Sequence, residues 1–199
     1  MGERTRRSSL VSLQRVFEPP LTIGVIADTH IYPGARRRLP PEVLDLFRRA
    51  GVGLIVHLGD ANSRSVLEEL AESAPLIAVP GNNDDPELQD LLPETIRFSV
   101  GKFRFGVMHG HGGRSARDQV IRKFSGKVDC VLFGHSHKPL IEQVGSTILF
   151  NPGSATDRRW FDHFGVGLIT VEEEKFTPDL VLYTDPAHLA NVDVETRRS

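Results

Sequence analysis

Short apolar runs alternate with helical patterns through the first half of the chain. The apolar runs cover residues 21–28, 52–60 and 75–82, and continuous runs of this length are typical of strands buried on both faces. Between them, residues 40–51 and 63–73 carry apolar side chains at helical spacing. The order strand, helix, strand, helix, strand predicts a right-handed βαβ arrangement with parallel strands.

The second half of the chain has the pattern of hairpins. A glycine and a lysine at 101–102 separate two strand-like segments, and residues 140–151 and 165–184 are rich in further strand patterns. Helices are expected at 86–92 and 115–124. Parallel pairing in the first half and antiparallel pairing in the second predict two sheets packed face to face, with helices outside.

The two ends of the chain differ from this central region. Residues 1–20 hold four arginines among serines and show little apolar periodicity, so we expect a flexible N-terminal extension. Residues 21–185 form the single predicted domain, and residues 186–199 are expected to form a loose tail.

Composition narrows the class of protein. The 199 residues are 39% hydrophobic and carry a formal net charge of −2, so one globular domain is expected, with no membrane partner and no stable nucleic-acid complex. The single cysteine, Cys130, excludes an internal disulfide framework and all-thiolate zinc sites. Apolar runs are shorter than the roughly 18 residues of a membrane span, and a secretory signal pattern is missing, so we expect a cytoplasmic location.

Polar side chains that can bind metals follow the predicted strands, and several of them stand beside a glycine. Taken singly, a Gly-Asp or Gly-Asn pair is more often a turn, and a His-x-His pair is only a moderate indication of a metal. The carboxyl ends of strands form the edge of an α/β sheet where ligands bind, so these side chains are expected to meet there. The residues concerned are Asp28, His30, Asp60, Asn82, His109, His135 and His137.

The motifs D-x-H, G-D, G-N-x-D, H-G-H and G-H-S-H follow one another between residues 23 and 154. In this order they resemble the calcineurin-like metallophosphoesterases, and the N-P-G-S stretch at 151–154 resembles the small YfcE-like phosphodiesterases. The resemblance implies an α/β fold, a four-layer α/β/β/α sandwich of two mixed sheets flanked by helices. It further implies one metal held by Asp28, His30, Asp60 and His137, and a second held by Asp60, Asn82, His109 and His135.

Two divalent transition-metal ions are therefore the expected cofactors. Imidazole nitrogens mixed with carboxylate and amide oxygens suit Mn²⁺, Fe²⁺, Co²⁺, Ni²⁺ or Zn²⁺, and manganese is our first expectation. The implied reaction is hydrolysis of a small or nucleotide-like phosphodiester by attack of a metal-bridging hydroxide, with Asp60 as the bridging ligand. The sequence leaves open whether the chain forms a homo-oligomer.

The proton donor and the substrate contacts depart from the wider superfamily. Many of its phosphatases have a histidine directly after the asparagine ligand, whereas this chain has Asn83, and an amide is no general acid. His111 is the nearest candidate, either to protonate the leaving group and contact substrate or to support the metal ligands. Asn82 and Arg158 are further candidate substrate contacts, and Asp84 is a candidate for orienting a ligand.

Two other functions are compatible with these motifs. A phosphomonoesterase or a nuclease would use the same metals, although the sequence has no evident basic channel for nucleic acid. A non-catalytic interaction scaffold, resembling the retromer subunit of the superfamily, needs no complete ligand set. All seven expected ligands are present here, which favours an enzyme.

Overall fold

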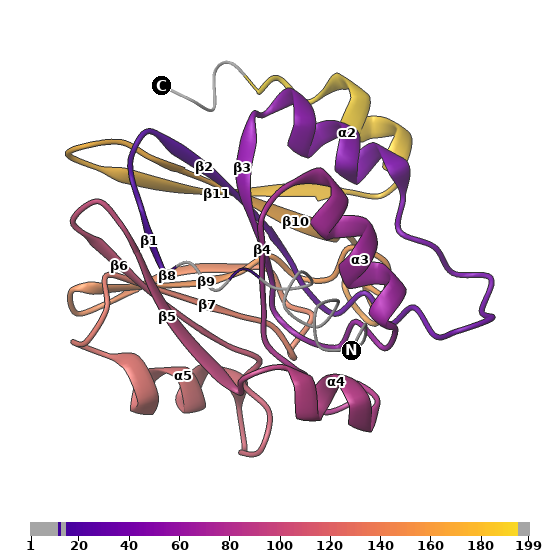
Figure 1. The fold of residues 1–199 in the computed structure, drawn as a ribbon, viewed down its shortest axis with the longest axis horizontal. Coiled ribbons are helices and arrows are strands. Elements are labelled where there is room, and N and C mark those ends of the chain that lie inside the picture. Colours follow the sequence, from indigo (N-terminus) through magenta and orange to yellow (C-terminus); the bar gives the residue numbers. More distant parts are fainter. Residues whose placement is uncertain (1–11, 13–14, 195–199) are drawn as a thin grey trace, which may run out of the picture.

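The computed structural model describes residues 12 and 15–194, and within them two β-sheets pack face to face (Figure 1). One sheet has the strand order β11-β10-β2-β3-β4, and the other has the order β1-β5-β6-β7-β9-β8. Helices cover the outer face of each sheet, so the molecule is the expected four-layer α/β/β/α sandwich.

The first sheet begins with the predicted βαβ units. Strands β2 (Leu21–Ile26), β3 (Val52–His57) and β4 (Leu76–Ala78) are parallel. They are connected by α2 (Pro41–Arg49) and α3 (Arg64–Ser73), and the Ser63 side chain caps α3 by accepting a hydrogen bond from the Ser65 amide. Helices α2 and α3 therefore lie on the outer face of this sheet, as the apolar spacing indicates.

Strands from the C-terminal half complete the first sheet, which the sequence did not indicate. β10 (Phe164–Val171) pairs antiparallel with β2, and β11 (Phe176–Tyr183) pairs antiparallel with β10. A glycine in β10 allows this strand to lie close to the second sheet, since a Cβ on Gly167 would lie 2.5 Å from the ring of Phe150 in β9. Both sheets are therefore mixed, as the resemblance implies, although the pairing does not divide into a parallel first half and an antiparallel second half.

The second sheet also combines both kinds of pairing. β5 (Thr95–Val100) and β6 (Phe103–Met108) form the predicted hairpin, and β8 (Leu140–Val144) pairs antiparallel with β9 (Thr147–Asn151). β7 (Cys130–Phe133) runs parallel to both β6 and β9. Helix α5 (Ala116–Phe124) covers the outer face, while α4 (Pro86–Leu91) follows β4.

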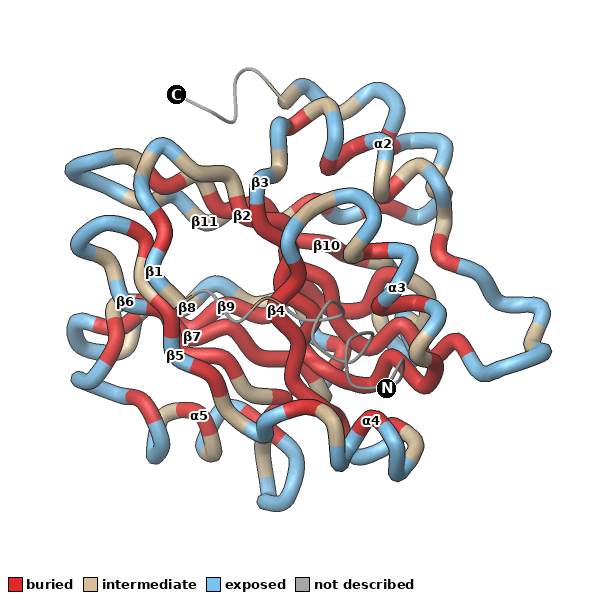
Figure 2. Tube along the Cα trace, in the orientation of Figure 1, coloured by how far each residue is buried: buried red, intermediate tan, exposed pale blue. Residues whose placement is uncertain are grey.

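Apolar side chains from both sheets fill the space between them, and the central parts of the strands are accordingly coloured as buried in Figure 2. Phe105 and Phe150 are fully buried there, as are Val25 and Leu54 of the first sheet. Burial on this scale fixes the two sheets against each other and holds their strand ends in place.

Parts of both predicted flexible ends are ordered. Within the expected extension 1–20, β1 (Val16–Phe17) pairs with β5, because the Phe17 ring packs edge-on against Phe98 and is buried. Within the expected tail, η1 (Pro186–Asn191) buries Leu189 against α2. Residues 1–11, 13–14 and 195–199 of these predicted segments lie outside the described residues. Among the described helices, none has the length and apolar character needed to cross a bilayer.

Candidate metal centre

The predicted ligands come from loops that follow strands of both sheets. Asp28 follows β2 and Asp60 follows β3, and the two loops are joined because the His30 amide donates to the Asp60 carbonyl at 2.9 Å. His109 follows β6 and His135 follows β7 in the second sheet. The carboxyl-terminal ends of β2 and β3 in one sheet and of β6 and β7 in the other therefore meet at one edge of the sandwich, as predicted from the position of the ligands at strand ends.

The backbone at this edge is unusually rich in left-handed conformations. Outside glycine such values are uncommon, and they concentrate at functional sites where the surrounding structure enforces them. The described non-glycine residues with positive φ are Asp28, His30, Asp60, Asn62, His135, His137 and Arg159. Five of the seven predicted ligands are among them, so the local backbone is shaped to turn these side chains toward a common point.

Asp28, His30 and His137 form the first group of possible ligands, with donor atoms within 4.8 Å of one another. The Nε2 atoms of His30 and His137 are 3.1 Å apart, and His137 Nε2 lies 3.4 Å from an Asp28 oxygen. His137 Nδ1 bonds to the Asp157 carbonyl, so it carries the proton and Nε2 keeps its lone pair. Metal-binding histidines are commonly oriented in this way.

Asp60, His109 and His135 form the second group, again within 4.8 Å. His109 Nδ1 donates to the Leu58 carbonyl at 2.7 Å, which leaves Nε2 as the free acceptor at 3.3 Å from Asp60 Oδ2. That Nε2 atom is buried and makes no hydrogen bond within the described structure. A divalent cation would satisfy it, so the donor set fits the metal that the motifs imply.

Asp60 lies between the two groups. Its Oδ2 atom is 3.6 Å from His30 Nε2 in the first group and 3.3 Å from His109 Nε2 in the second. Burial acts to raise the Asp60 pKa, but the interaction with the adjacent His109 and the hydrogen bonds from Asn83 outweigh it and hold the pKa below its usual range. Asp60 is therefore an anion, in the position that a shared ligand needs.

Burial shifts the ionisation of the other groups toward neutral forms. It raises the pKa of Asp28 to about 7 and lowers the pKa of His137 to about 4. It also lowers the pKa of His30 and of His135. Neutral imidazoles are the forms that bind metals, and a cation supplies the charge that stabilises a buried Asp28 carboxylate.

Glycines beside the ligands make this convergence possible. A Cβ on Gly81 would lie 2.1 Å from Asp60 Oδ1, and a Cβ on Gly134 would lie 2.8 Å from Asp28 Oδ2. A Cβ on Gly59 would lie 2.6 Å from His109 Nδ1. In these three motifs the absent glycine side chain leaves the space that a ligand side chain from another loop occupies.

Asn82, the amide among the expected ligands, stays a prediction. Asn82 is exposed, and its side chain makes no hydrogen bond among the described residues. The neighbouring Asn83 instead donates from its backbone amide to Asp60 Oδ1 at 2.8 Å and from its side chain to Oδ2 at 2.7 Å. The turn that carries both asparagines is anchored by Asp84, which accepts from the Gly81 amide at 2.7 Å.

Of three residues that support the ligands, one escaped the sequence reasoning and two lie in the motifs that it used. His57 is buried and accepts a hydrogen bond from the Gly59 amide at 3.2 Å, and burial lowers its pKa to about 3. In the sequence, nothing distinguishes it from the other residues of its strand. Asp84 also accepts from the amides of Asp60 and Asn62, an orienting role that its motif position suggested. Ser154 of the N-P-G-S stretch donates to the Asp28 carbonyl at 2.7 Å.

His111 and Arg158, two of the three proposed substrate contacts, lie differently relative to the ligand groups. His111 is exposed next to the second group, with its ring centroid 5.5 Å from that of His109. Arg158 points elsewhere, because its guanidinium donates to the Phe161 and Asp162 carbonyls and lies over the Phe164 ring. Its neighbour Arg159 faces the site, and its positive charge acts on Asp28 and on His137.

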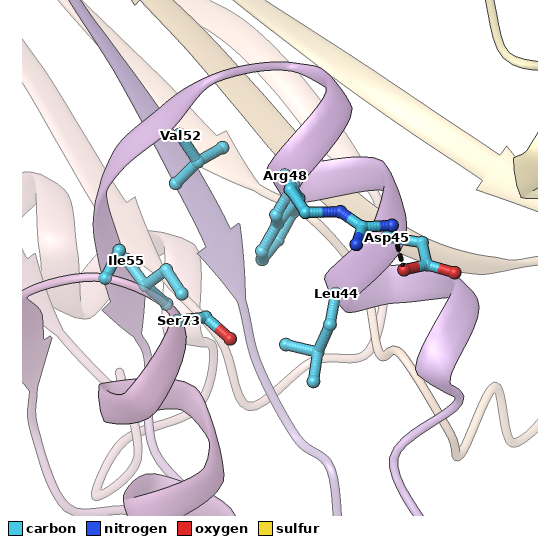
Figure 3. A pocket seen from close by; sticks show the side chains of 8 residues that line it. Leu44, Asp45, Arg48, Val52, Ile55 and Ser73 are labelled. Carbon is cyan, nitrogen blue, oxygen red and sulfur yellow. Dashed lines mark hydrogen bonds and ion pairs between the residues drawn. The ribbon is translucent and has the colours of Figure 1, made fainter.

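Cavities open on both sides of the ligand groups. One, of about 450 Å³, is lined by His30, Tyr32, Arg37, Asn83, Asp157 and Arg159. The other, of about 400 Å³, is lined by His109, His111, Gln119, Arg122 and Lys123 with five further residues. A third cavity, between Leu44 of α2 and Ser73 of α3 over β3, contains none of the candidate ligands (Figure 3). The ligand groups thus separate two spaces for a substrate.

Fold and donor set together define a metal-binding α/β sandwich, and comparison with known proteins gives the family. Residues 21–174 match the model of the calcineurin-like phosphoesterase superfamily domain, and the chain belongs to this family.

Named relatives agree with this membership. A "Probable metallophosphoesterase" of Methanothermobacter thermautotrophicus is 34% identical over 163 residues, which cover 81% of this chain and 92% of the relative. Phosphodiesterase YfcE of Escherichia coli K12 is 32% identical over 133 residues, covering 57% of this chain and 70% of YfcE. The crystal structure of Entamoeba histolytica Vps29 with zinc has a TM-score of 0.65 at 23% identity, and the match covers 81% of this chain and 99% of that one, so it shares the fold.

Proposed function

We propose that this protein is a phosphodiesterase that hydrolyses small phosphodiesters at a centre of two divalent metal ions. The observation that carries the proposal is the pair of ligand groups, each with a carboxylate and two imidazoles, with Asp60 Oδ2 of the second group only 3.6 Å from His30 Nε2 of the first. Asp28, His30, Asp60 and His137 are assigned to one ion. The second ion is assigned to Asp60, His109 and His135, with Asn82 as a further ligand.

The two ions, when bound, lower the pKa of water and stabilise charge on the phosphoryl oxygens. The protein's own contribution is to hold the ligands rigidly. Backbone carbonyls of Leu58 and Asp157 fix the tautomers of His109 and His137, and the Asn83 amide holds the Asp60 carboxylate. Such preorganisation removes the need to rearrange the site during the reaction.

Arg159 supplies positive charge at the rim of the site. Its guanidinium acts on Asp28 and His137 and forms no ion pair within the described residues, whereas Arg37 pairs with Asp157 at 3.2 Å. Arg159 is therefore the arginine that we assign to a substrate phosphate oxygen, in place of Arg158. His111, across the ligand groups from Arg159, is the candidate donor of a proton to the leaving oxygen.

Manganese is the metal that we propose, with iron, cobalt, nickel or zinc as the alternatives to be compared. The donors are imidazole nitrogens and carboxylate oxygens, and the described cysteine, Cys130, is buried in the core away from them. This donor chemistry accepts each of these ions, so activity after reconstitution with each metal decides among them.

The test is hydrolysis of bis(p-nitrophenyl) phosphate by metal-reconstituted protein, together with its metal content. We expect turnover with two bound ions per chain. Asp60→Asn should lower turnover by at least about 100-fold and weaken binding of both ions, because a neutral amide replaces the shared carboxylate. Asp45→Asn is the matched control, since Asp45 is an exposed carboxylate paired with Arg48 on α2.

Turnover, and not metal content, distinguishes the proposed enzyme from a non-catalytic interaction scaffold. The Vps29 structure that shares the fold also carries zinc, so bound metal does not distinguish the two functions. Metal-loaded protein that hydrolyses no phosphodiester or phosphomonoester would contradict the enzyme proposal. Faster hydrolysis of p-nitrophenyl phosphate than of the diester would favour a phosphomonoesterase.

A further inference from the structure

The cavity beside His30 contains an aromatic side chain for which the proposed chemistry has no use. Tyr32 is 51% exposed and lines this cavity of about 450 Å³ together with Arg37 and Arg159. An exposed tyrosine so close to an ionic site has little structural reason to be there, because exposure gives it no packing energy.

The loop that carries Tyr32 is fixed before any ligand binds. The Ala35 amide donates to the Tyr32 carbonyl at 3.0 Å, with Pro33 and Gly34 in the turn between them and a φ of 78° at Gly34. Proline followed by a glycine of positive φ is the signature of a type II turn. Arg37 then ties the loop to Asp157 at 3.2 Å and to the His30 carbonyl. Tyr32 is thus half exposed on a rigid base.

The charges around Tyr32 suit an anion that also carries a flat ring. Arg37 is neutralised by Asp157, which leaves Arg159 as the unpaired cation in this cavity's lining. Arg159 adopts a positive φ of 48°, an unfavourable backbone conformation for arginine that directs this residue into the lining. The wall therefore offers one cation, for phosphate, and one aromatic face.

The second cavity, which His111 lines, has no side chain like Tyr32. Its lining contains Gln119, Arg122, Lys123 and Glu94 but no phenylalanine, tyrosine or tryptophan. The two sides of the ligand groups are therefore chemically unequal. An asymmetric phosphodiester would bind in one preferred orientation, with an aromatic substituent on the Tyr32 side.

We propose that the Tyr32 cavity binds a planar aromatic substituent of the substrate, as in a nucleoside or aryl phosphodiester, by stacking it on the Tyr32 ring. The inference rests on the proposed function, and it narrows the substrate class of that same site. The substituent lies on the side of Arg159, away from His111, so it stays attached to phosphorus when the other ester bond breaks. The expected products are a nucleoside or aryl monophosphate and an alcohol.

Binding of two product-like probes tests the stacking directly. Adenosine 5′-monophosphate and ribose 5-phosphate share the phosphate and the sugar, so their affinities for the Mn²⁺-loaded protein, measured by calorimetry, differ by the base. We expect the nucleotide to bind about tenfold more tightly, as for stacking at the lower end of the usual range. Tyr32→Ala should remove this difference, and Tyr32→Phe should keep it because the ring is retained.

The control variant is Ile141→Ala, which shortens a comparably exposed side chain on β8 and should leave the tenfold preference intact. Equal affinity of the wild type for the two probes, or a preference that survives Tyr32→Ala, would overturn the inference, and so would failure of both probes to bind. Because binding is measured without turnover, failure of the proposed function is seen separately, as absent hydrolysis. An active enzyme with no base preference keeps the proposed function and rejects the Tyr32 subsite.

Discussion

Asn83 lies where a proton-donating histidine would sit in many relatives of this fold, and the structure gives it a different task. Its two amide groups donate to both oxygens of Asp60, at 2.8 and 2.7 Å. A residue that fixes the shared carboxylate by two hydrogen bonds contributes to metal binding and supplies no proton. Any acid catalysis must therefore come from another side chain, and His111 is the nearest.

Replacing His111 with glutamine tests that role. We expect kcat for an alkyl phosphodiester to fall by about 100-fold, while an aryl phosphodiester, whose leaving anion needs no proton, is cleaved at nearly the original rate. The measurement is kcat on both substrates for the variant and for His188→Gln, which changes an exposed histidine of η1. Equal losses on the two substrates would mean that His111 positions the substrate or the metals.

His57 gives a prediction about stability. Burial lowers its pKa to about 3, so between that pH and about 6.5 the unfolded chain binds a proton that the folded chain does not. His57 therefore costs stability as the pH falls through this window. In urea unfolding of metal-free protein at several pH values, His57→Asn should reduce the slope of stability against pH there. A slope as steep as that of the wild type would show that His57 ionises normally.

At the scale of elements, glycines at strand ends determine how closely the loops approach. Gly81→Ala would place a Cβ 2.1 Å from Asp60 Oδ1 in the undistorted structure, so the Asp60 loop must move. We expect metal affinity to fall by about 10- to 100-fold, as for the loss of other groups that orient ligands. Gly53→Ala is the control, because its Cβ would meet only the end of the Leu21 side chain. Metal titration with both variants measures the effect, and unchanged affinity in Gly81→Ala would contradict it.

The sequence was sufficient for the elements whose signals are local. Ser63 and Ser115 cap helices α3 and α5 with their side chains, and the hairpin turn falls between β5 and β6, as predicted. The sequence was insufficient for predicting which distant strands pair, since no local signal indicates that β10 pairs with β2 rather than with a strand of the second sheet. The ordering of β1 likewise depends on Phe17 meeting Phe98, a residue 81 positions away.

The site shows the same division between local and distant signals. The strand-end rule brought together Asp28, Asp60, His109 and both histidines of G-H-S-H, because parallel strands deliver their ends to one edge. Which of two adjacent asparagines reaches Asp60 depends on the turn that Asp84 anchors, and no spacing rule determines that. The same holds for Arg158 and Arg159, which point in different directions from neighbouring positions.

Over the whole molecule, acidification should affect the two ions unequally. Burial lowers the pKa of His30, His135 and His137, so these imidazoles stay neutral below pH 6.5 and continue to bind metal. Burial also acts to lower the His109 pKa, but Asp60 and Asp28 outweigh it and the pKa is raised. Of the four imidazoles, His109 therefore takes up a proton first, and the ion that it binds should leave first.

Metal content after dialysis at stepwise lower pH measures this order. One equivalent should be lost at a higher pH than the other, and raising free Mn²⁺ should move both losses to lower pH, since metal and protons compete for the same nitrogens. The acid limb of activity should shift with them. An acid limb that stays fixed when Mn²⁺ is raised would instead report a catalytic group or the substrate.

The origin of the ligands in two different sheets has a mechanical consequence. Asp28, His30 and Asp60 belong to loops of one sheet, and His109, His135 and His137 belong to loops of the other. An ion bound between them acts as a cross-link at one end of a sandwich whose core is held by apolar packing and whose loops share a few hydrogen bonds, such as that between His109 and the Leu58 carbonyl. Saturation at 100 times Kd would add about 2.7 kcal/mol to the free energy of unfolding. Chelation should then lower the melting temperature and loosen the ligand-bearing edge first, leaving the opposite edge of the sandwich protected from hydrogen exchange.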